Sequence, residues 1–227
     1  MSAIIQTPDK PTTGGSRSLR SRTARWPIQK GGIELLLGIV ALMWFVEIIN
    51  WIDGYGLDND GIYSRSLSHL WGIFTAPFIH ANFAPHLIDN TIPFVFMGVI
   101  IALRGARQVA IVTAIVIVLG GLGTWLIGPA HVSTIGASGV VLGYATYLLT
   151  RGLFNHSLLE LLTGGVVGVI WGGALLSSLV PHTGVSWQGH LSGGLAGVVA
   201  AYVLARQDPR RARRSVGTAR PAKALAK

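Results

Sequence analysis

The sequence predicts an all-α polytopic membrane protein, a bundle of six transmembrane helices, on three observations. Half of the 227 residues are hydrophobic and only 12% are charged, about half the charged share of a typical soluble domain. The apolar residues gather in six blocks, most of them long enough to cross a hydrocarbon core of about 30 Å. The blocks show no alternation of apolar and polar residues, so no sheet is expected.

The six blocks lie in a membrane domain that we place at residues 32–205. The expected helices are 33–51, 85–103, 109–127, 138–150, 158–180 and 189–205. The fourth of them is too short to cross a full bilayer, so the loop before it, 128–137, should dip into the membrane. Irregular backbone at that depth is tolerated only where protein shields it or where it lines an aqueous cavity. We therefore expect a pocket that opens to the extracellular side.

Two basic tails flank this domain, residues 1–31 and 206–227. Both are rich in Ser, Thr, Ala, Pro and Gly, which favours disorder. Of the 18 Lys and Arg residues, only Arg65 falls in a loop on the side opposite to the tails. Both termini are therefore expected in the cytoplasm of an integral protein of the plasma (inner) membrane. The net charge of +9 suits contact with anionic lipid headgroups rather than with nucleic acid.

Some chemistries are not expected. The chain contains no cysteine, which rules out disulfides and thiolate catalysis. The first apolar block is too long for the core of a cleaved signal peptide. The histidines lack the spacing of a zinc site, so neither a metal nor another cofactor is expected; they include His80, His86, His131, His182 and His190.

Ser138 is the candidate nucleophile. It follows Gly136-Ala137 and opens the fourth apolar block. At a helix N-terminus the unpaired backbone N–H groups and the positive end of the dipole would stabilise an oxyanion. The plainer interpretation is a small residue that eases helix packing. The motif is not the nucleophile elbow of α/β-hydrolases, because Val140 stands where the last glycine should be.

His190 is the candidate general base, at about the depth of Ser138 on the sixth block. Its plainer interpretation is a structural histidine. Close approach of the fourth and sixth helices would bring it within reach of the Ser138 hydroxyl. The glycines expected to permit this packing around the site are Gly136, Gly139, Gly143, Gly193 and Gly197.

His86 and Asn90 are four residues apart, so a helix would place them on one face. With the backbone N–H of Ser138 they could form an oxyanion hole; the alternative is a polar contact between helices. Asp89 lies near the same face, and we expect a structural role for it. His80 is expected to cap or brace the loop rather than to act in catalysis.

Together these residues resemble the rhomboid family of intramembrane serine proteases. The matching motifs are His86-x-x-x-Asn90, Gly136-x-Ser138-Gly139 and Gly189-His190-x-x-Gly193-x-x-x-Gly197, in the family's order. The resemblance covers roughly residues 70–202. The resemblance implies a six-helix bundle and a Ser138–His190 dyad. It further implies an oxyanion site at His86 and Asn90, no cofactor, and transmembrane proteins as substrates, cut near their extracytoplasmic end.

The chain departs from the family pattern at three places, one of which is His80, which lies one residue further from His86 than is usual. Trp71-Gly72 stands where many members have Trp-Arg, and Leu142 replaces an aromatic residue that would stack on the base. Two other functions remain open: a catalytically silent rhomboid-like protein that binds transmembrane clients, and a transporter. Since the serine and the histidine are both present, we expect the protease. The sequence predicts neither the substrate nor the oligomeric state; substrate access past the fifth helix is a further expectation.

Overall fold

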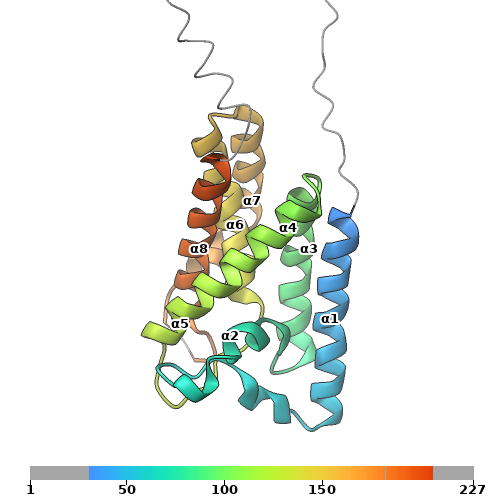
Figure 1. The fold of residues 1–227 in the computed structure, drawn as a ribbon, viewed down its shortest axis with the longest axis vertical. Coiled ribbons are helices and arrows are strands. Elements are labelled where there is room, and N and C mark those ends of the chain that lie inside the picture. Colours follow the sequence, from blue (N-terminus) through green and yellow to red (C-terminus); the bar gives the residue numbers. More distant parts are fainter. Residues whose placement is uncertain (1–30, 182, 207–227) are drawn as a thin grey trace, which may run out of the picture.

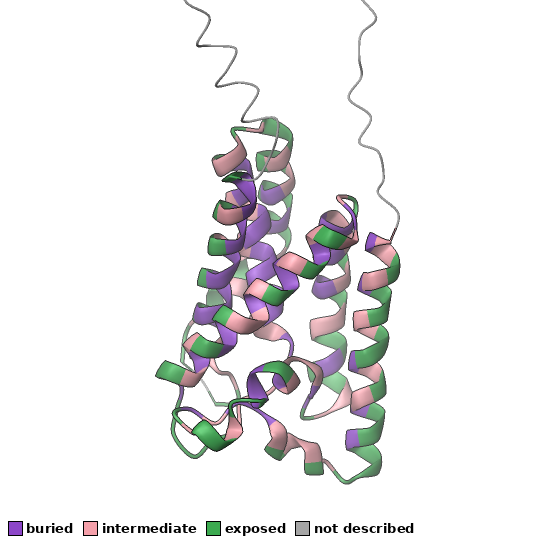
Figure 2. Ribbon diagram, viewed as in Figure 1, coloured by how far each residue is buried: buried purple, intermediate pink, exposed green. Residues whose placement is uncertain are grey.

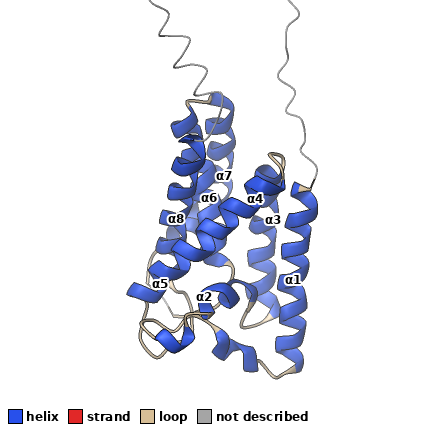
Figure 3. Ribbon diagram, in the orientation of Figure 1, coloured by secondary structure: helices blue, strands red, loops and turns tan. Residues whose placement is uncertain are grey.

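The computed structural model describes residues 31–181 and 183–206. Within them the regular structure is helical (Figures 1 and 3), and Ile62 and Thr134 form an isolated β-bridge. The long elements are α1 (Gly32–Ile52), α3 (Ile88–Ala102), α4 (Ala106–Ile115), α5 (Gly121–Ile127), α6 (Ser138–Asn155), α7 (Leu158–Ser177) and α8 (Trp187–Arg206). The short ones are η1 (Gly56–Asp60), η2 (Leu67–His69), α2 (Gly72–Thr75), η3 (Ala76–Phe78), η4 (Phe83–Leu87) and η5 (Val116–Gly120). The predicted all-α class is confirmed.

Among the described residues, four helical segments are long and apolar enough to cross a membrane: Gly32–Ile52, Phe83–Ala102, Ala106–Ile127 and Leu158–Ser177. They correspond to the first, second, third and fifth predicted helices. In the second, η4 runs directly into α3, and in the third η5 joins α4 to α5. The chain is therefore a polytopic membrane protein. The α6 and α8 helices reach a similar length, 18 and 20 residues, but they are less apolar.

The prediction of a short fourth helix is wrong. The α6 helix continues to Asn155 and has 18 residues, which at 1.5 Å per residue is about 27 Å. It runs past Thr150 because Gly152 packs tightly on α7: a Cβ there would lie 2.4 Å from the Leu161 backbone nitrogen. The helix ends only at His156, whose φ is 50°. Because α6 is not short, its length gives no reason to expect that the loop 128–137 dips into the membrane.

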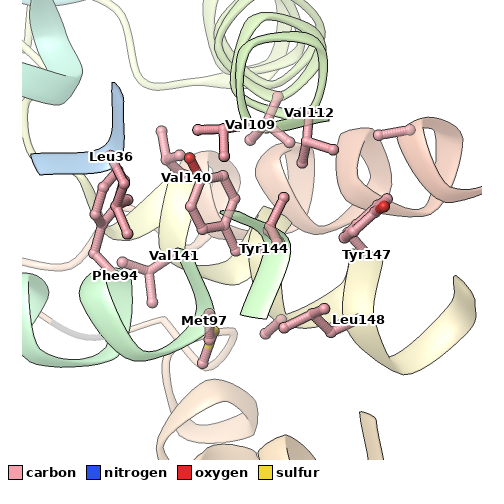
Figure 4. Close-up of a cluster of buried hydrophobic side chains, with 14 of the residues drawn as sticks. Leu36, Phe94, Met97, Val109, Val112, Val140, Val141, Tyr144, Tyr147 and Leu148 are labelled. Atoms are coloured by element: carbon pink, nitrogen blue, oxygen red, sulfur yellow. The ribbon is translucent and has the colours of Figure 1, made fainter. Parts of the chain in front are cut away.

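The α6 and α8 helices occupy the centre of the bundle. Figure 2 shows them mostly buried, whereas the outer faces of α1 and α7 are exposed. Tyr144 of α6 is fully buried and stacks on Phe94 of α3, with ring centroids 5.0 Å apart; Val109 and Val112 of α4 lie in the same cluster (Figure 4). Because α6 and α8 contact other helices more than lipid, they can carry polar residues that an outer helix could not.

The chain enters α1 and leaves α8 at the same end of the bundle (Figure 1). At that end Glu160 of α7 forms ion pairs with Arg104, which follows α3, and with Arg151 of α6. Because the chain enters and leaves the bundle at the same end, the fold agrees with an even number of membrane crossings. The side of the membrane that this end faces stays a prediction. Most of the two predicted tails, residues 1–30 and 207–227, lies outside the described residues.

Candidate active site

One cavity of about 240 Å³ contains all four candidate residues, Ser138, His190, His86 and Asn90, in its wall. They come from three separate parts of the chain: the N-terminal end of α6, the first turn of α8, and η4 with the start of α3. The η5–α5 segment closes the cavity with Val116, Gly120, Gly121 and Thr124. Ile62 and Ile73, from the loop region between α1 and α3, are apolar parts of the same wall.

Ser138 is the first residue of α6. The turn before it is held at two points: Gly136 N–H donates to the Ala76 carbonyl at 2.8 Å, and Ala137 N–H donates to Nε2 of His80 at 3.2 Å. Gly136 has φ of 109°, and a Cβ there would meet little except Ser138 Oγ, at 3.9 Å. Gly136 is thus required by its left-handed backbone and not, as expected from the sequence, by helix packing.

His190 lies in the first turns of α8, where its side chain is 7% exposed. Ser186 precedes the helix and caps it, accepting the Gly189 N–H on its hydroxyl at 3.2 Å and the His190 N–H on its carbonyl at 3.1 Å. The Nδ1 atom of His190 lies 2.8 Å from the carbonyl oxygen of Ser178. A carbonyl oxygen only accepts, so Nδ1 carries the proton of the neutral ring. Nε2 is then the nitrogen able to take a proton from a nucleophile.

Glycines bring α6 and α8 into backbone contact beside these two residues. A Cβ on Gly193 would lie 2.0 Å from the Gly139 carbonyl oxygen, and one on Gly197 would lie 2.0 Å from that of Gly143. A Cβ on Gly139 would lie 3.1 Å from the carbonyl oxygen of Gly189. Gly139 follows Ser138 directly and Gly189 precedes His190 directly. Ser138 and His190 are therefore next to close backbone contacts between the two helices.

His86 and Asn90 are stacked one turn apart at the start of the second span. Asn90 Nδ2 donates to the His86 carbonyl at 2.9 Å, which leaves its second amide hydrogen for another acceptor. Asn82 Oδ1 accepts from the His86 backbone N–H at 3.2 Å and lies 2.9 Å from His86 Nδ1. With that assignment His86 can donate from Nε2 only when the ring carries both protons. Asp89 is exposed and lies outside the cavity wall.

His80 braces the loop that precedes Ser138. It is 1% exposed, its backbone N–H donates to Oε2 of Glu47 on α1 at 3.1 Å, and its carbonyl accepts from Asn50 Nδ2 at 3.2 Å. Burial lowers the pKa of His80 to about 4, against the opposite effect of the Phe78 backbone carbonyl. The ring is therefore neutral near pH 7, and its Nε2 can accept the Ala137 N–H. A chain of contacts thus links Glu47 of α1, through His80, to the residue before Ser138.

Gly72, where many family members have an arginine, has no space for a side chain. A Cβ there would lie 2.1 Å from the Gly61 carbonyl oxygen. In this chain the backbone at Gly72 instead packs directly against the backbone at Gly61. Within residues 31–181 and 183–206, no three His, Asp or Glu side chains gather in a way that could hold a metal ion.

Comparison with known proteins assigns the family. The Rhomboid domain family matches residues 67–207, which include every candidate catalytic residue. This chain is a member of the rhomboid family. The uncharacterized protein Rv1337 of Mycobacterium tuberculosis (strain ATCC 25618 / H37Rv) is 43% identical over 204 residues, covering 86% of this chain and 85% of the relative.

Two further relatives extend the comparison. The uncharacterized protein ML1171 of Mycobacterium leprae (strain TN) is 39% identical over 230 residues, covering 97% of this chain and 89% of the relative. The Bacillus subtilis (strain 168) protein named "Putative rhomboid protease YdcA" is 22% identical over 185 residues, or 79% of this chain and 91% of that protein. The names of the mycobacterial relatives state no activity. Proteolysis by this rhomboid protein is therefore a proposal.

Sequence reasoning missed three polar contributors to the site. Asn82 lies four residues before His86, a spacing that could have suggested a contact. Ser186 lies three residues before Gly189 at the start of an apolar block, which is a recognisable capping position. The carbonyl of Ser178 has no sequence signal, because every residue has a carbonyl.

Proposed function

We propose that this rhomboid protein is an intramembrane serine endopeptidase that cleaves transmembrane proteins near their extracytoplasmic end. The observation that carries the proposal is the shared cavity, in which Ser138, His190, His86 and Asn90 meet at the N-terminus of α6. A bundle of six transmembrane helices, with α6 and α8 as the inner pair and both termini in the cytoplasm, completes the proposed arrangement.

The first half of the reaction forms an acyl-enzyme. Ser138 Oγ attacks the scissile carbonyl carbon while Nε2 of His190 takes the hydroxyl proton. The negative charge that develops on the carbonyl oxygen is stabilised by the Ser138 N–H, by the Asn90 amide and, when its ring carries both protons, by His86. As the tetrahedral intermediate collapses, the C–N bond breaks and the imidazolium of His190 gives its proton to the leaving amine.

The second half releases the new carboxyl end. A water molecule reaches the cavity from the extracytoplasmic side, gives a proton to Nε2 of His190 and attacks the ester carbon. The same donors stabilise the second oxyanion, and His190 returns the proton to Ser138 Oγ as the ester bond breaks. No metal or organic cofactor takes part in this sequence of steps.

The deciding experiment is labelling of the detergent-purified protein with a fluorophosphonate probe, which reacts only with activated serines. We expect label on the wild type and none on Ser138→Ala or His190→Ala. Ser177→Ala is the matched control, because the side chain of this exposed serine donates to the Ala174 carbonyl of its own helix at 2.9 Å, and the variant should label like the wild type. Absence of label on a folded wild type would instead favour the silent protein that binds transmembrane clients.

A further inference from the structure

The second ring nitrogen of His190 is bound by the end of another helix. Its Nδ1 donates to the carbonyl oxygen of Ser178 at 2.8 Å, and Ser178 is the C-cap residue of α7, with φ of −69° and ψ of −12°. Carbonyl groups in the last turn of a helix have no partner within the helix. Here one of these carbonyls accepts from the side chain of the proposed base.

This contact has the chemistry of an orienting group. In serine hydrolases a third group receives the Nδ1 proton of the histidine, fixes its tautomer and stabilises the imidazolium that forms. The Ser178 carbonyl accepts the Nδ1 proton in the same way, so that Nε2 can take the serine proton. The negative end of the α7 dipole also favours a cation at this position. Leu142 offers no aromatic ring to hold the imidazole, and the Ser178 carbonyl is an orienting contact for His190.

The helix that supplies the carbonyl is held firmly at its other end. Near the start of α7, Glu160 pairs with Arg104 and Arg151 and accepts from Asn155 Nδ2 at 2.6 Å. A Cβ on Gly164 would lie 2.5 Å from the Leu148 carbonyl oxygen. These contacts fix the first half of α7 against α6.

The second half of α7 packs on α3, where the Trp171 and Phe96 ring centroids are 4.7 Å apart, but it faces an open groove on the side of α8. A Cβ on Gly172 or Gly173 would have no atom within 4 Å. An apolar groove of about 370 Å³ separates this half from α6 and α8, and its wall includes Gly172, Leu179 and His190 itself. The hydrogen bond to Ser178 therefore joins the base to a helix end that has few other contacts with α8.

We propose that the backbone carbonyl of Ser178 is the positioning group of the catalytic base, so that the Ser138–His190 dyad is competent only while the C-terminal end of α7 lies against α8. The proposal rests on the protease function proposed above. It makes α7 part of the catalytic apparatus through its backbone, with no side chain of that helix in contact with the reacting atoms.

A proline at position 179 tests the carbonyl directly. The residue before a proline is displaced from the α-region, so Leu179→Pro should rotate the Ser178 carbonyl away from His190. Leu179→Ala is the matched control, because it removes the same side chain and keeps the backbone. Thermal unfolding and gel filtration in detergent would establish that both variants are folded.

Two measurements compare the variants with the wild type. The first is the ¹⁵N NMR spectrum of histidine-labelled protein at neutral pH, in which the His190 signal is assigned by its loss in His190→Gln. The wild type and Leu179→Ala should show the Nδ1–H tautomer, and Leu179→Pro should lose it. The second is the fluorophosphonate labelling rate. It should fall at least tenfold in Leu179→Pro, since a positioned base contributes roughly 10²–10⁴ in rate, and change less than about threefold in Leu179→Ala.

Three outcomes would overturn the proposal. One is a wild-type His190 in the Nε2–H tautomer, and this result would decide the matter even if Leu179→Pro did not fold. Another is normal labelling of a folded Leu179→Pro that has lost the tautomer. The third is a wild type with the Nδ1–H tautomer that does not label at all, which would remove the protease function and with it the catalytic role of the carbonyl, while leaving the hydrogen bond in place.

Discussion

Gly193 of α8 lies against Gly139 of α6, at a distance that leaves no room for a methyl group between them. A Cβ at Gly193 would fall 2.0 Å from the Gly139 carbonyl oxygen, and that oxygen belongs to backbone that cannot rotate away as a side chain could. The contact lies one residue after Ser138 and three residues after His190. The close approach of α8 to α6 beside the proposed nucleophile and base therefore requires that residue 193 has no side chain.

Gly193→Ala should inactivate the protein by moving α8 away from α6. Overpacking of this kind costs about 1–3 kcal/mol of stability, and a shift of a few tenths of an ångström or more would lengthen the path of the proton between Ser138 and His190. We expect the fluorophosphonate labelling rate to fall at least tenfold. Gly165→Ala on α7 is the control, since a Cβ there would meet no atom within 4 Å; equal rates in both variants would contradict the packing argument.

Asn90→Ala should slow turnover without disabling the nucleophile. Loss of one oxyanion donor typically lowers kcat by about 10²–10³-fold, and the Asn90 amide is the neutral side-chain donor in this part of the cavity. The measurement is kcat on a cleavable transmembrane substrate. Asp89→Ala removes the exposed neighbouring side chain, outside the cavity wall, and should cleave at nearly the wild-type rate. A similar loss in both variants would argue for a structural role of the whole turn.

The stability of the protein should fall as the pH drops from about 6.5 to about 4, because of His80. In the unfolded chain His80 titrates at the ordinary histidine pKa of 6.5, and burial lowers the pKa of the folded ring to about 4. Between these two values the unfolded chain binds the proton and the folded protein does not, so acid favours unfolding. The full difference corresponds to roughly 3 kcal/mol, and no further loss from this group is expected below pH 4.

Melting temperatures of the wild type and of His80→Gln, measured across this pH range in detergent, would check the contribution. The variant should be less stable at pH 7, where the wild-type ring accepts the Ala137 N–H, and its melting temperature should depend less steeply on pH. His131→Gln alters an exposed histidine and should retain the wild-type slope. Parallel slopes in all three proteins would exclude His80 as the source.

Glu160→Gln should loosen the end of the bundle at which the chain enters α1 and leaves α8. The carboxylate faces the guanidinium groups of Arg104 and Arg151 in a partly buried position. Removing one partner of a fully buried ion pair costs about 3–5 kcal/mol, so we expect a smaller cost here. We expect a clear drop in melting temperature, with α7 the first helix to gain amide hydrogen exchange. Glu34→Gln changes an exposed carboxylate on α1 and should have little effect. An unchanged melting temperature in Glu160→Gln would show that the pairs are not stabilising.

The sequence by itself determined the membrane class, the approximate position of each helix, and the residues Ser138, His190, His86 and Asn90 as candidates, because hydrophobic length and short motifs are local properties of the chain. Only the tertiary structure decided that α6 runs to Asn155, since that end depends on the contact of Gly152 with α7. It also decided the pairing of His80 with the Ala137 N–H and of His190 with the Ser178 carbonyl. In both contacts the histidine pairs with a backbone group. Every residue has such a group, so the sequence does not indicate which one a histidine will meet, and only the folded structure does.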